Sequence, residues 1–356
     1  MNRKVLFVCW SLRPIHGTLL HALSEALDRM GCHGSFLGRT ESAPSGAANL
    51  QTSITCSSLF GLISLLVRGR LRGFDLVYLQ STHPMNLCLS MWAKFHGLKI
   101  AYYLHEPTGF LEKVRKGDAT LYAALVRVTQ VLECWFADVV FVATPALVGK
   151  VHALHLARQA QVLALPLAIP DLVSTSARAP RARARLLYLG RAHPMRCLDR
   201  FTELAERLHA SGLGILPTML TYNPVEAPSP FIDTRAGSSY TDAEMLDLLE
   251  ESFLVWNVYD VEYSQSGVTP VALRSGVPLL VSRFENETAL VEEGVAFEVA
   301  LEPFDLDGLI KQVHGLRESF EPTSAQCLAY FQRTYAPQAL IPCLEKATAL
   351  QPSQGR

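Results

Sequence analysis

Two arginines stand near the end of an apolar run in the second half of the chain. Arg191 follows Gly190 directly, and Arg196 comes five residues later. Two guanidinium groups beside a strand-to-helix turn suit a diphosphate, because each planar fork donates paired hydrogen bonds to phosphate oxygens and keeps its charge. The alternative is one surface arginine and one arginine in an ion pair.

A turn of small polar residues follows a second apolar run, residues 253–258. Gln265, Ser266 and Gly267 precede Val268, where a helical pattern begins. Backbone N–H groups in such a turn, together with the partial positive charge of a helix start, form an anion site. An ordinary strand–loop–helix connection is the alternative, since such turns recur throughout α/β proteins.

A histidine and a glutamate end a predicted strand in the first half of the chain. His105 and Glu106 precede Pro107. An imidazole and a carboxylate can perform acid–base chemistry or bind sugar hydroxyls; a hydrogen-bonded pair with a structural role is the alternative. The helical H-E-x-x-H zinc pattern is absent, so neither a metal nor another cofactor is expected. The turn at residues 11–18, with Gly17, is a further candidate for the ligand cleft.

The elements that must position these groups alternate between strand and helix. Apolar runs typical of buried strands cover residues 4–10, 74–79, 99–104, 138–143, 161–165, 185–189, 215–222, 253–258, 278–282 and 295–299. Helical spacing covers residues 19–30, 59–67, 85–95, 121–135, 146–154, 198–209, 242–250, 268–276, 288–293, 305–316, 324–331 and 337–349. Residues 41–53 and the proline-rich stretch up to about Gly237 are interpreted as loops. This alternation predicts parallel sheets with right-handed crossovers.

The alternation stops and restarts once, which predicts two domains. Residues 166–183 are rich in Pro, Ala, Ser and Arg, a composition typical of a linker. We therefore expect a first domain over residues 1–170, a linker over 171–184 and a second domain over 185–325. The remaining residues, 326–356, are expected to form helices that return toward the first domain.

Composition excludes several classes of protein. The chain of 356 residues has 32 basic and 33 acidic side chains, so its charge gives no argument for nucleic-acid binding. Its 8 cysteines form no C-x-x-C pair, which argues against a zinc ribbon and favours a reducing compartment. No apolar stretch reaches the length of a transmembrane helix, and the apolar run near the start is too short for a secretory signal. A cytoplasmic protein is expected.

One apolar helix suggests contact with a membrane surface. Residues 59–67 carry no charge and are followed by Arg68, Arg70 and Arg72. Cations at this end complement the helix dipole, and they also suit anionic headgroups. A solvated helix end is the alternative, because three arginines are fewer than the usual polybasic cluster.

Taken together, these segments resemble retaining glycosyltransferases of the family 4 type, which have the two-domain GT-B fold. The resemblance is carried by residues 187–191 (LYLGR), Arg196, residues 240–244 (YTDAE), residues 273–278 (LRSGVP), Gly294, and, in the first half, residues 103–107 (YLHEP). Cys197 replaces the glycine of the family's Lys-Gly pair, and Arg196 replaces the lysine. The segment at residues 335–337 and the closing helix resemble the family's tail, which crosses back to the first domain.

The resemblance implies two tandem Rossmann-like domains facing a cleft, with the acceptor in the first and a nucleotide-sugar donor in the second. It implies that Arg191 and Arg196 neutralise the diphosphate and that residues 265–268 offer it backbone N–H groups. His105 is expected near the donor sugar, with Glu106 beside it, and Gly190 at the cleft.

One departure from the family concerns its pair of glutamates. Counted back from Gly276, the two positions hold Tyr263 and Val271, and neither is acidic. Glu262 lies one residue before the first position and is a substitute by a register shift. The Gln-Ser-Gly-Val string also resembles a subgroup of these transferases that uses Gln-Ser-Gly in place of the first glutamate.

The resulting prediction is a glycosyltransferase, of the hexosyl type and retaining. It would move a sugar from a nucleotide-diphosphate sugar to a hydroxyl of a glycan or lipid-linked acceptor, in surface polysaccharide biosynthesis on the cytoplasmic face of a membrane. Two alternatives remain: a catalytically inactive partner subunit with this fold, which the missing glutamates suggest, and a nucleotide-sugar epimerase.

Overall fold

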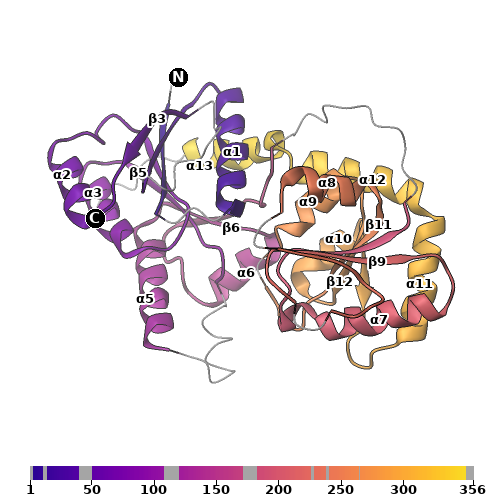
Figure 1. Cartoon of the computed structure of the whole chain (residues 1–356). Helices are drawn as coiled ribbons and strands as arrows, with labels where there is room; N and C mark the ends of the chain where they lie inside the picture. Colours follow the sequence, from indigo (N-terminus) through magenta and orange to yellow (C-terminus); the bar gives the residue numbers. More distant parts are fainter. Residues whose placement is uncertain are drawn as a thin grey trace. The chain divides into compact units, whose positions relative to one another are not determined.

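The computed structural model describes residues 3–10, 14–39, 50–107, 120–170, 183–225, 228–237, 240–263 and 265–349. The chain divides into two compact units: unit 1 contains Met1–Asp171 and Thr334–Arg356, and unit 2 contains Leu172–Arg333. Each unit has its own parallel sheet with helices packed against it (Figure 1). This is the fold class that the sequence predicts.

Unit 1 is built on a seven-stranded parallel sheet of order β3-β2-β1-β4-β5-β6-β7. The strands are β1 (Lys4–Cys9), β2 (His33–Gly38), β3 (Leu50–Thr55), β4 (Leu76–Leu79), β5 (Lys99–Tyr103), β6 (Val139–Val142) and β7 (Gln161–Ala164). The central strands are buried over nearly their whole length, because helices cover both faces of a parallel sheet.

The helices of unit 1 are α1 (Pro14–Arg29), α2 (Leu59–Val67), α3 (Pro84–Phe95), α5 (Leu121–Phe136), α6 (Pro145–Ala153) and α13 (Pro337–Ala349). Several begin at side-chain caps, as at Ser58, whose hydroxyl accepts from the Gly61 N–H. The C-terminal helix α13 packs against α1 and places Leu340, Leu344 and Ala347 in the core of this unit.

Unit 2 is built on a six-stranded parallel sheet of order β10-β9-β8-β11-β12-β13. The strands are β8 (Arg185–Leu189), β9 (Leu216–Thr221), β10 (Asp233–Ala236), β11 (Ser252–Asn257), β12 (Leu279–Ser282) and β13 (Ala296–Val299). The helical segments are η2 (Pro194–Arg196), α7 (Leu198–Ala210), α8 (Asp242–Glu250), α9 (Val268–Arg274), η3 (Glu285–Glu287), α10 (Thr288–Glu292), α11 (Leu306–Glu318) and α12 (Phe320–Thr334).

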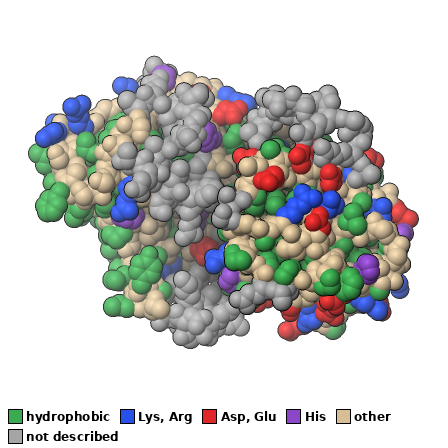
Figure 2. All heavy atoms as spheres, in the orientation of Figure 1, with side chains coloured by type: hydrophobic (Ala, Val, Ile, Leu, Met, Phe, Trp, Pro, Cys, Tyr) green, Lys and Arg blue, Asp and Glu red, His purple; other side chains and the backbone are tan. Residues whose placement is uncertain are grey.

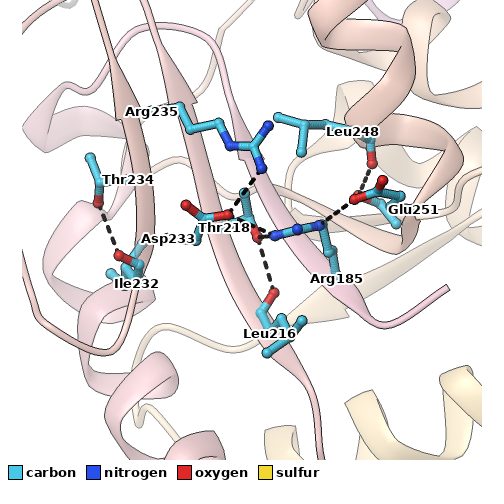
Figure 3. A network of polar contacts seen from close by, with 10 residues as sticks. Arg185, Leu216, Thr218, Ile232, Asp233, Thr234, Arg235, Leu248 and Glu251 are labelled. Atoms are coloured by element: carbon cyan, nitrogen blue, oxygen red, sulfur yellow. Dashed lines mark hydrogen bonds and ion pairs between the residues drawn. The ribbon is translucent and has the colours of Figure 1, made fainter. Parts of the chain in front are cut away.

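An arginine-centred network fastens the amino ends of three strands in unit 2 (Figure 3). Arg185 donates to Thr218 Oγ1, Asp233 Oδ2 and Glu251 Oε2, each at 2.8 Å. Arg235 adds a second cation at 3.3 Å from Asp233. Arg185 is therefore a structural arginine, and it lies at the edge of the sheet opposite to the one where ligands of such folds bind.

The structure corrects three details of the predicted elements. Strand β2 escapes prediction because its sequence, HGSFLG, interrupts the apolar run with polar and small residues. Strands β3 and β10 lie at sheet edges and overlap the predicted loops; β10 has the sequence DTRA and is mostly exposed, so burial imposes no apolar pattern on it.

Helix α1 begins at Pro14, a residue type favoured in a first helical turn, so Gly17 lies inside a helix and not in a turn. Residues 11–13 of that predicted turn lie outside the described residues.

Candidate functional site

The strand order of unit 2 reverses between β8 and β11. Chain connections leave these two neighbouring strands in opposite directions. In open α/β sheets, ligands bind in the crevice that such a reversal forms beyond the carboxyl ends of the strands. Two segments line this point: residues 190–197, which follow β8, and residues 258–263 with 265–267, which follow β11. Both segments contain residues that the sequence marks for anion binding.

Arg196 is buried at this crevice without a carboxylate partner. Its side chain is among the least exposed of the charged groups, at 5%. The guanidinium donates to the carbonyl oxygen of Leu189 at 2.5 Å and, more weakly, to those of Arg191 and Trp256 at 3.4 Å. Within the described part of the chain it forms no ion pair, and its Nε has no hydrogen-bond acceptor.

Aromatic rings support the same guanidinium. Its central carbon lies 4.7 Å from the ring centroid of Tyr188 and 5.3 Å from that of Tyr259. The backbone is held as well, since Trp256 Nε1 donates to the Arg196 carbonyl at 3.2 Å. Ring faces attract cations, so these contacts fix the position of the charge without neutralising it.

Gly190 makes room for this arginine. Its φ is +106°, a conformation that side chains rarely adopt, and a Cβ there would lie 2.9 Å from Arg196 Nη1 and 3.7 Å from Val268 Cγ2. Gly190 therefore adjoins both the buried guanidinium and the first residue of α9. The structure thus brings together three of the predicted cleft residues.

The turn before α9 has the predicted position. Ser266 is buried, and its hydroxyl accepts from the Val268 N–H at 3.3 Å and from the Tyr259 hydroxyl at 3.3 Å. Gly267 is the N-cap and supplies no side-chain acceptor. Gln265 and Glu262 are half-buried in the same connection.

Arg191 is exposed in the segment that follows β8. Its carbonyl accepts from the Tyr188 hydroxyl at 3.1 Å, while its side chain contacts no carboxylate in the described ranges. The loop that carries it is tied to strand β9, because Asn223 exchanges hydrogen bonds with the backbone of Ala192 at 2.8 and 2.9 Å. No motif in the sequence singles out Asn223.

The structure also reveals a buried carboxyl group that the sequence analysis missed. Tyr263, in the connection that follows β11, donates from its hydroxyl to Glu287 Oε1 of η3. Burial raises the pKa of Glu287 to about 7, while the hydrogen bond from Tyr263 opposes this effect. Asn257 Nδ2 donates to Tyr263 at 3.2 Å and to Thr269 at 3.3 Å.

This Tyr263–Glu287 pair connects to the arginine through stacked rings. The rings of Tyr259 and Tyr263 lie 3.9 Å apart, and Tyr259 also faces Arg196. Glu287 Oε2 and Asn257 Oδ1 are buried and have no partner within the described residues. No sequence signal would have found Glu287, because it belongs to the next connection along the sheet.

A separate pocket of about 1200 Å³ lies on the same edge of this sheet, near the start of α7 and the end of β13. Its lining includes Pro194 and Cys197, which lie on either side of Arg196 in the sequence, but none of the predicted phosphate-binding residues. Its lining holds the five carboxylates of Asp199, Glu203, Glu206, Asp260 and Glu302 and the two guanidinium groups of Arg200 and Arg283, so its net charge is negative. A surface with this charge disfavours a diphosphate.

In unit 1, the corresponding reversal lies between β1 and β4, and His105 is close to it. His105 Nε2 lies 2.8 Å from the carbonyl oxygen of Gln80, which follows β4, and the centroid of its ring lies 4.6 Å from that of the tilted Tyr103 ring. Gln80 is fully buried, and its Oε1 has no partner in the described segments. Glu106 is exposed beside this histidine.

A second buried carboxyl group, also missed from the sequence, lies behind this edge. Glu133 of α5 accepts from Asn86 Nδ2 at 2.7 Å and from the backbone N–H of His83 at 3.1 Å. Trp10, at the end of β1, donates to Asn86 Oδ1 at 2.6 Å. Burial raises the pKa of Glu133 to about 7, an effect that the two donated hydrogen bonds oppose.

The described ranges hold neither a metal-binding cluster nor a membrane-spanning helix. They contain no group of three His, Cys, Asp or Glu side chains placed to hold a metal ion. No described helix combines the length and apolarity needed to cross a bilayer.

Comparisons with known proteins support the fold. No family model matches the sequence, and no curated protein matches it either. The structure is similar to Anabaena Alr3699/HepE in complex with UDP, with a TM-score of 0.72 and 13% identity over 98% of this chain and 100% of that one. It is also similar to the spinosyn forosaminyltransferase SpnP, with a TM-score of 0.58 and 16% identity over 98% and 100%.

A third similar structure is a putative UDP-N-acetylglucosamine 2-epimerase from Listeria monocytogenes. Its TM-score is 0.63, with 13% identity over 100% of both chains. At these identities the likeness defines the fold alone. The chain therefore has two parallel-sheet α/β units of the GT-B type.

Proposed function

We propose that this protein is a glycosyltransferase that uses a nucleotide-diphosphate sugar as donor. The observation that carries the proposal is Arg196, a buried cation at the strand-order reversal of unit 2 that lacks a carboxylate partner among the described residues. Buried charges are normally paired, because desolvation is costly. A bound diphosphate would supply the missing anion.

The similar structures add support from their bound ligands. Alr3699/HepE was solved in complex with UDP, with UDP and glucose, and with UDP-glucose. A donor of this class suits the crevice of unit 2, where Arg196 lies near the first residue of α9.

The mechanism follows from the charge that develops on the leaving group. As the bond from the sugar to the diphosphate breaks, negative charge grows on the phosphate oxygens. Arg191, Arg196 and the backbone N–H groups of residues 265–268 would stabilise it, and such preorganised stabilisation is usually the largest catalytic contribution. His105 and Glu106 of unit 1 would bind the sugar or move the acceptor proton, and Glu262 would be a further acid in the connection that follows β11.

The finer parts of the proposal concern stereochemistry, acceptor and location. We infer a retaining hexosyl transfer to a hydroxyl of a glycan or lipid-linked acceptor, within surface polysaccharide biosynthesis. The protein would work in the cytoplasm, in peripheral contact with the membrane that holds the acceptor. The resemblance of residues 187–191 and 273–278 to family 4 transferases motivates these inferences.

The second candidate is a nucleotide-sugar epimerase. The observation that favours it is the match over the full length of both chains to a putative UDP-N-acetylglucosamine 2-epimerase. Products separate the two activities: a transferase forms a glycosidic bond to an acceptor, whereas an epimerase returns the same nucleotide sugar with one inverted centre. Mass spectrometry and NMR of the products from a panel of UDP-sugars would decide between them. If the pure protein turns over no donor, by transfer, epimerisation or hydrolysis, it is instead an inactive partner subunit.

The binding test is a thermal-shift screen with nucleoside diphosphates and their sugars, since a ligand of the native state raises the unfolding midpoint. We expect binding, and we expect Arg191→Ala and Arg196→Ala each to weaken it by roughly 10- to 150-fold, the equivalent of the 1.5–3 kcal/mol typical of a charged hydrogen bond.

A matched control separates ligand binding from stability. Arg185→Ala removes an arginine of the same sheet that is paired with Asp233 and Glu251. It should lower the unfolding midpoint without changing nucleotide affinity. Because Arg196 is buried and its loss could unfold the unit, the exposed Arg191 provides the second test. Unchanged affinity in both site variants would refute the assignment.

A further inference from the structure

Three helices of unit 1 expose large apolar side chains to solvent. The most exposed are Phe60 (86%) and Val67 (78%) of α2, Phe95 (87%) of α3, and Leu121 (79%), Tyr122 (76%) and Leu125 (58%) of α5. Soluble monomers seldom expose apolar patches of more than a few hundred Å². Single exposed residues would need no explanation, whereas a group on neighbouring helices does.

The three helices are neighbours in space. Helix α3 packs against both α2 and α5, so the exposed residues lie on adjacent helices of the unit. Figure 2 shows hydrophobic side chains along the left margin over α2 and α3 and again below them over α5. We call these exposed faces of α2, α3 and α5 the apolar face of unit 1.

Helix α2 is apolar on both of its sides. It buries Leu62 and Leu66 in the core of unit 1, yet it exposes Phe60 and Val67 on the other side. An ordinary surface helix would carry polar residues there. The sequence of α2, LFGLISLLV, contains no charged residue at all. Its outer side therefore has the composition of a contact surface.

Positive charges border the apolar face. Arg68, Arg70 and Arg72 follow α2 directly, are exposed, and form no ion pair within the described residues. At the far end of α5, the guanidinium of Arg158 lies 4.9 Å from the ring centroid of Trp135. The only acidic residue within these three helices is Glu133, which is buried.

We propose that the apolar face of unit 1 binds an anionic membrane surface. The apolar side chains would enter the boundary between headgroups and acyl chains, and the arginines would contact lipid phosphates. Tyr122 and Trp135 have the amphipathic rings that are enriched at this depth. A second copy of the chain fits this face less well. In a two-fold dimer the apolar face would contact the same face of the partner, and its three helices have no exposed acidic residue to pair with the arginines.

This inference deepens the proposed function, because a membrane-bound enzyme can reach a lipid-linked acceptor, but it does not depend on sugar transfer. Vesicle binding is measured without donor or acceptor. Donor binding belongs to unit 2 in our proposal, so the two hypotheses can fail separately.

The test is flotation of the full chain with vesicles of phosphatidylcholine alone and of an equimolar mixture with phosphatidylglycerol. We expect binding to the anionic vesicles that weakens as salt is added. Phe60→Ser/Phe95→Ser should weaken binding at least roughly tenfold, because it removes two apolar anchors, and Arg68→Glu/Arg70→Glu/Arg72→Glu should do the same by reversing the charge.

Two control variants separate these effects from general changes in the surface. Arg68→Lys/Arg70→Lys/Arg72→Lys retains the charge and should retain binding. Leu216→Ser/Leu328→Ser removes two exposed leucines from unit 2 and should bind as the wild type does. Circular dichroism melting verifies that each variant is folded.

Three results would overturn the proposal. The first is failure of the wild type to bind anionic vesicles. The second is equal binding by the wild type and both site variants. The third is a dimer in sedimentation velocity that Phe60→Ser/Phe95→Ser dissociates, which would assign the apolar face to a second copy of the chain.

Discussion

At the scale of single residues, the buried carboxyl group of Glu133 couples stability to pH. Its pKa is raised from 4.5 to about 7 by burial. Between these two values the native state therefore binds more protons than the unfolded state, so stability falls as pH rises through this window and is lowest above it. The loss of stability across this pH interval is roughly 3 kcal/mol, because one pKa unit corresponds to about 1.36 kcal/mol.

Glu133→Gln should remove most of this pH dependence. Glutamine is neutral at every pH and can still accept from Asn86 and from the His83 N–H. From about pH 5 to about pH 8, the free energy of unfolding should therefore fall less in the variant, by up to roughly 3 kcal/mol. Urea unfolding at a series of pH values measures this free energy for the variant and for the wild type. The exposed Glu345→Gln is the control, and identical pH profiles for Glu133→Gln and wild type would contradict the prediction.

The positions of several candidate residues could be predicted from the sequence, because apolar runs show where buried strands end and the residue types after them suit anion binding. Gly190 and Arg196 follow an apolar run, and the structure places them together at the end of β8. The Tyr263–Glu287 pair could not be predicted, since its members come from different connections and meet only when β11 and β12 pair. Glu133 could not be predicted either, because it lies within a largely apolar helix and its partners come from other parts of the chain.

At the scale of elements, the connection from α9 to β12 depends on one glycine. Gly276 follows the end of α9 with φ +68°, and a Cβ at this position would lie 2.4 Å from Ser324 Oγ and 3.5 Å from the Ser324 carbonyl oxygen. A side chain at this position would therefore displace the Ser324 hydroxyl of α12. This gives a packing reason for the glycine in the Leu-Arg-Ser-Gly-Val-Pro segment.

Gly276→Ala should destabilise unit 2 through both backbone strain and steric overlap. The left-handed conformation costs about 1–2 kcal/mol in a non-glycine residue, and overpacking adds about 1–3 kcal/mol. Gly212→Ala isolates the first contribution, because Gly212 has φ +67° and a Cβ added there would meet no heavy atom within 4 Å. Urea unfolding followed by tryptophan fluorescence compares the two variants, and equal losses of stability would exclude the steric contribution.

The elements that the sequence did not reveal lie mostly at sheet edges. Buried strands such as β11 are recognised by an apolar run, because both of their faces pack against helices. Among the strands that the structure describes, the edge strand β10 pairs with β9 alone, and its polar residues are mostly exposed to solvent. Hydrophobic patterning therefore identifies the centre of each sheet better than its margins.

At the scale of the whole molecule, the chain leaves unit 1 at Asp171 and returns to it at Thr334. The returning helix α13 completes the core of unit 1, where Leu340 and Ala347 are fully buried and Leu344 nearly so. Unit 1 is thus assembled from both ends of the sequence. Its stability should depend on residues that the chain reaches only after unit 2 is complete.

Leu344→Ala should destabilise unit 1 and leave unit 2 unchanged. Removal of a buried leucine side chain costs about 2–5 kcal/mol, since it leaves a cavity. Amide hydrogen exchange read by mass spectrometry should show faster exchange in β1 and β4 and unaltered exchange in β8 and β11. Val313→Ala, in the core of unit 2, should give the opposite pattern. Accelerated exchange in both units from either substitution would mean that they unfold as one cooperative structure, so that α13 stabilises the whole chain and not unit 1 alone.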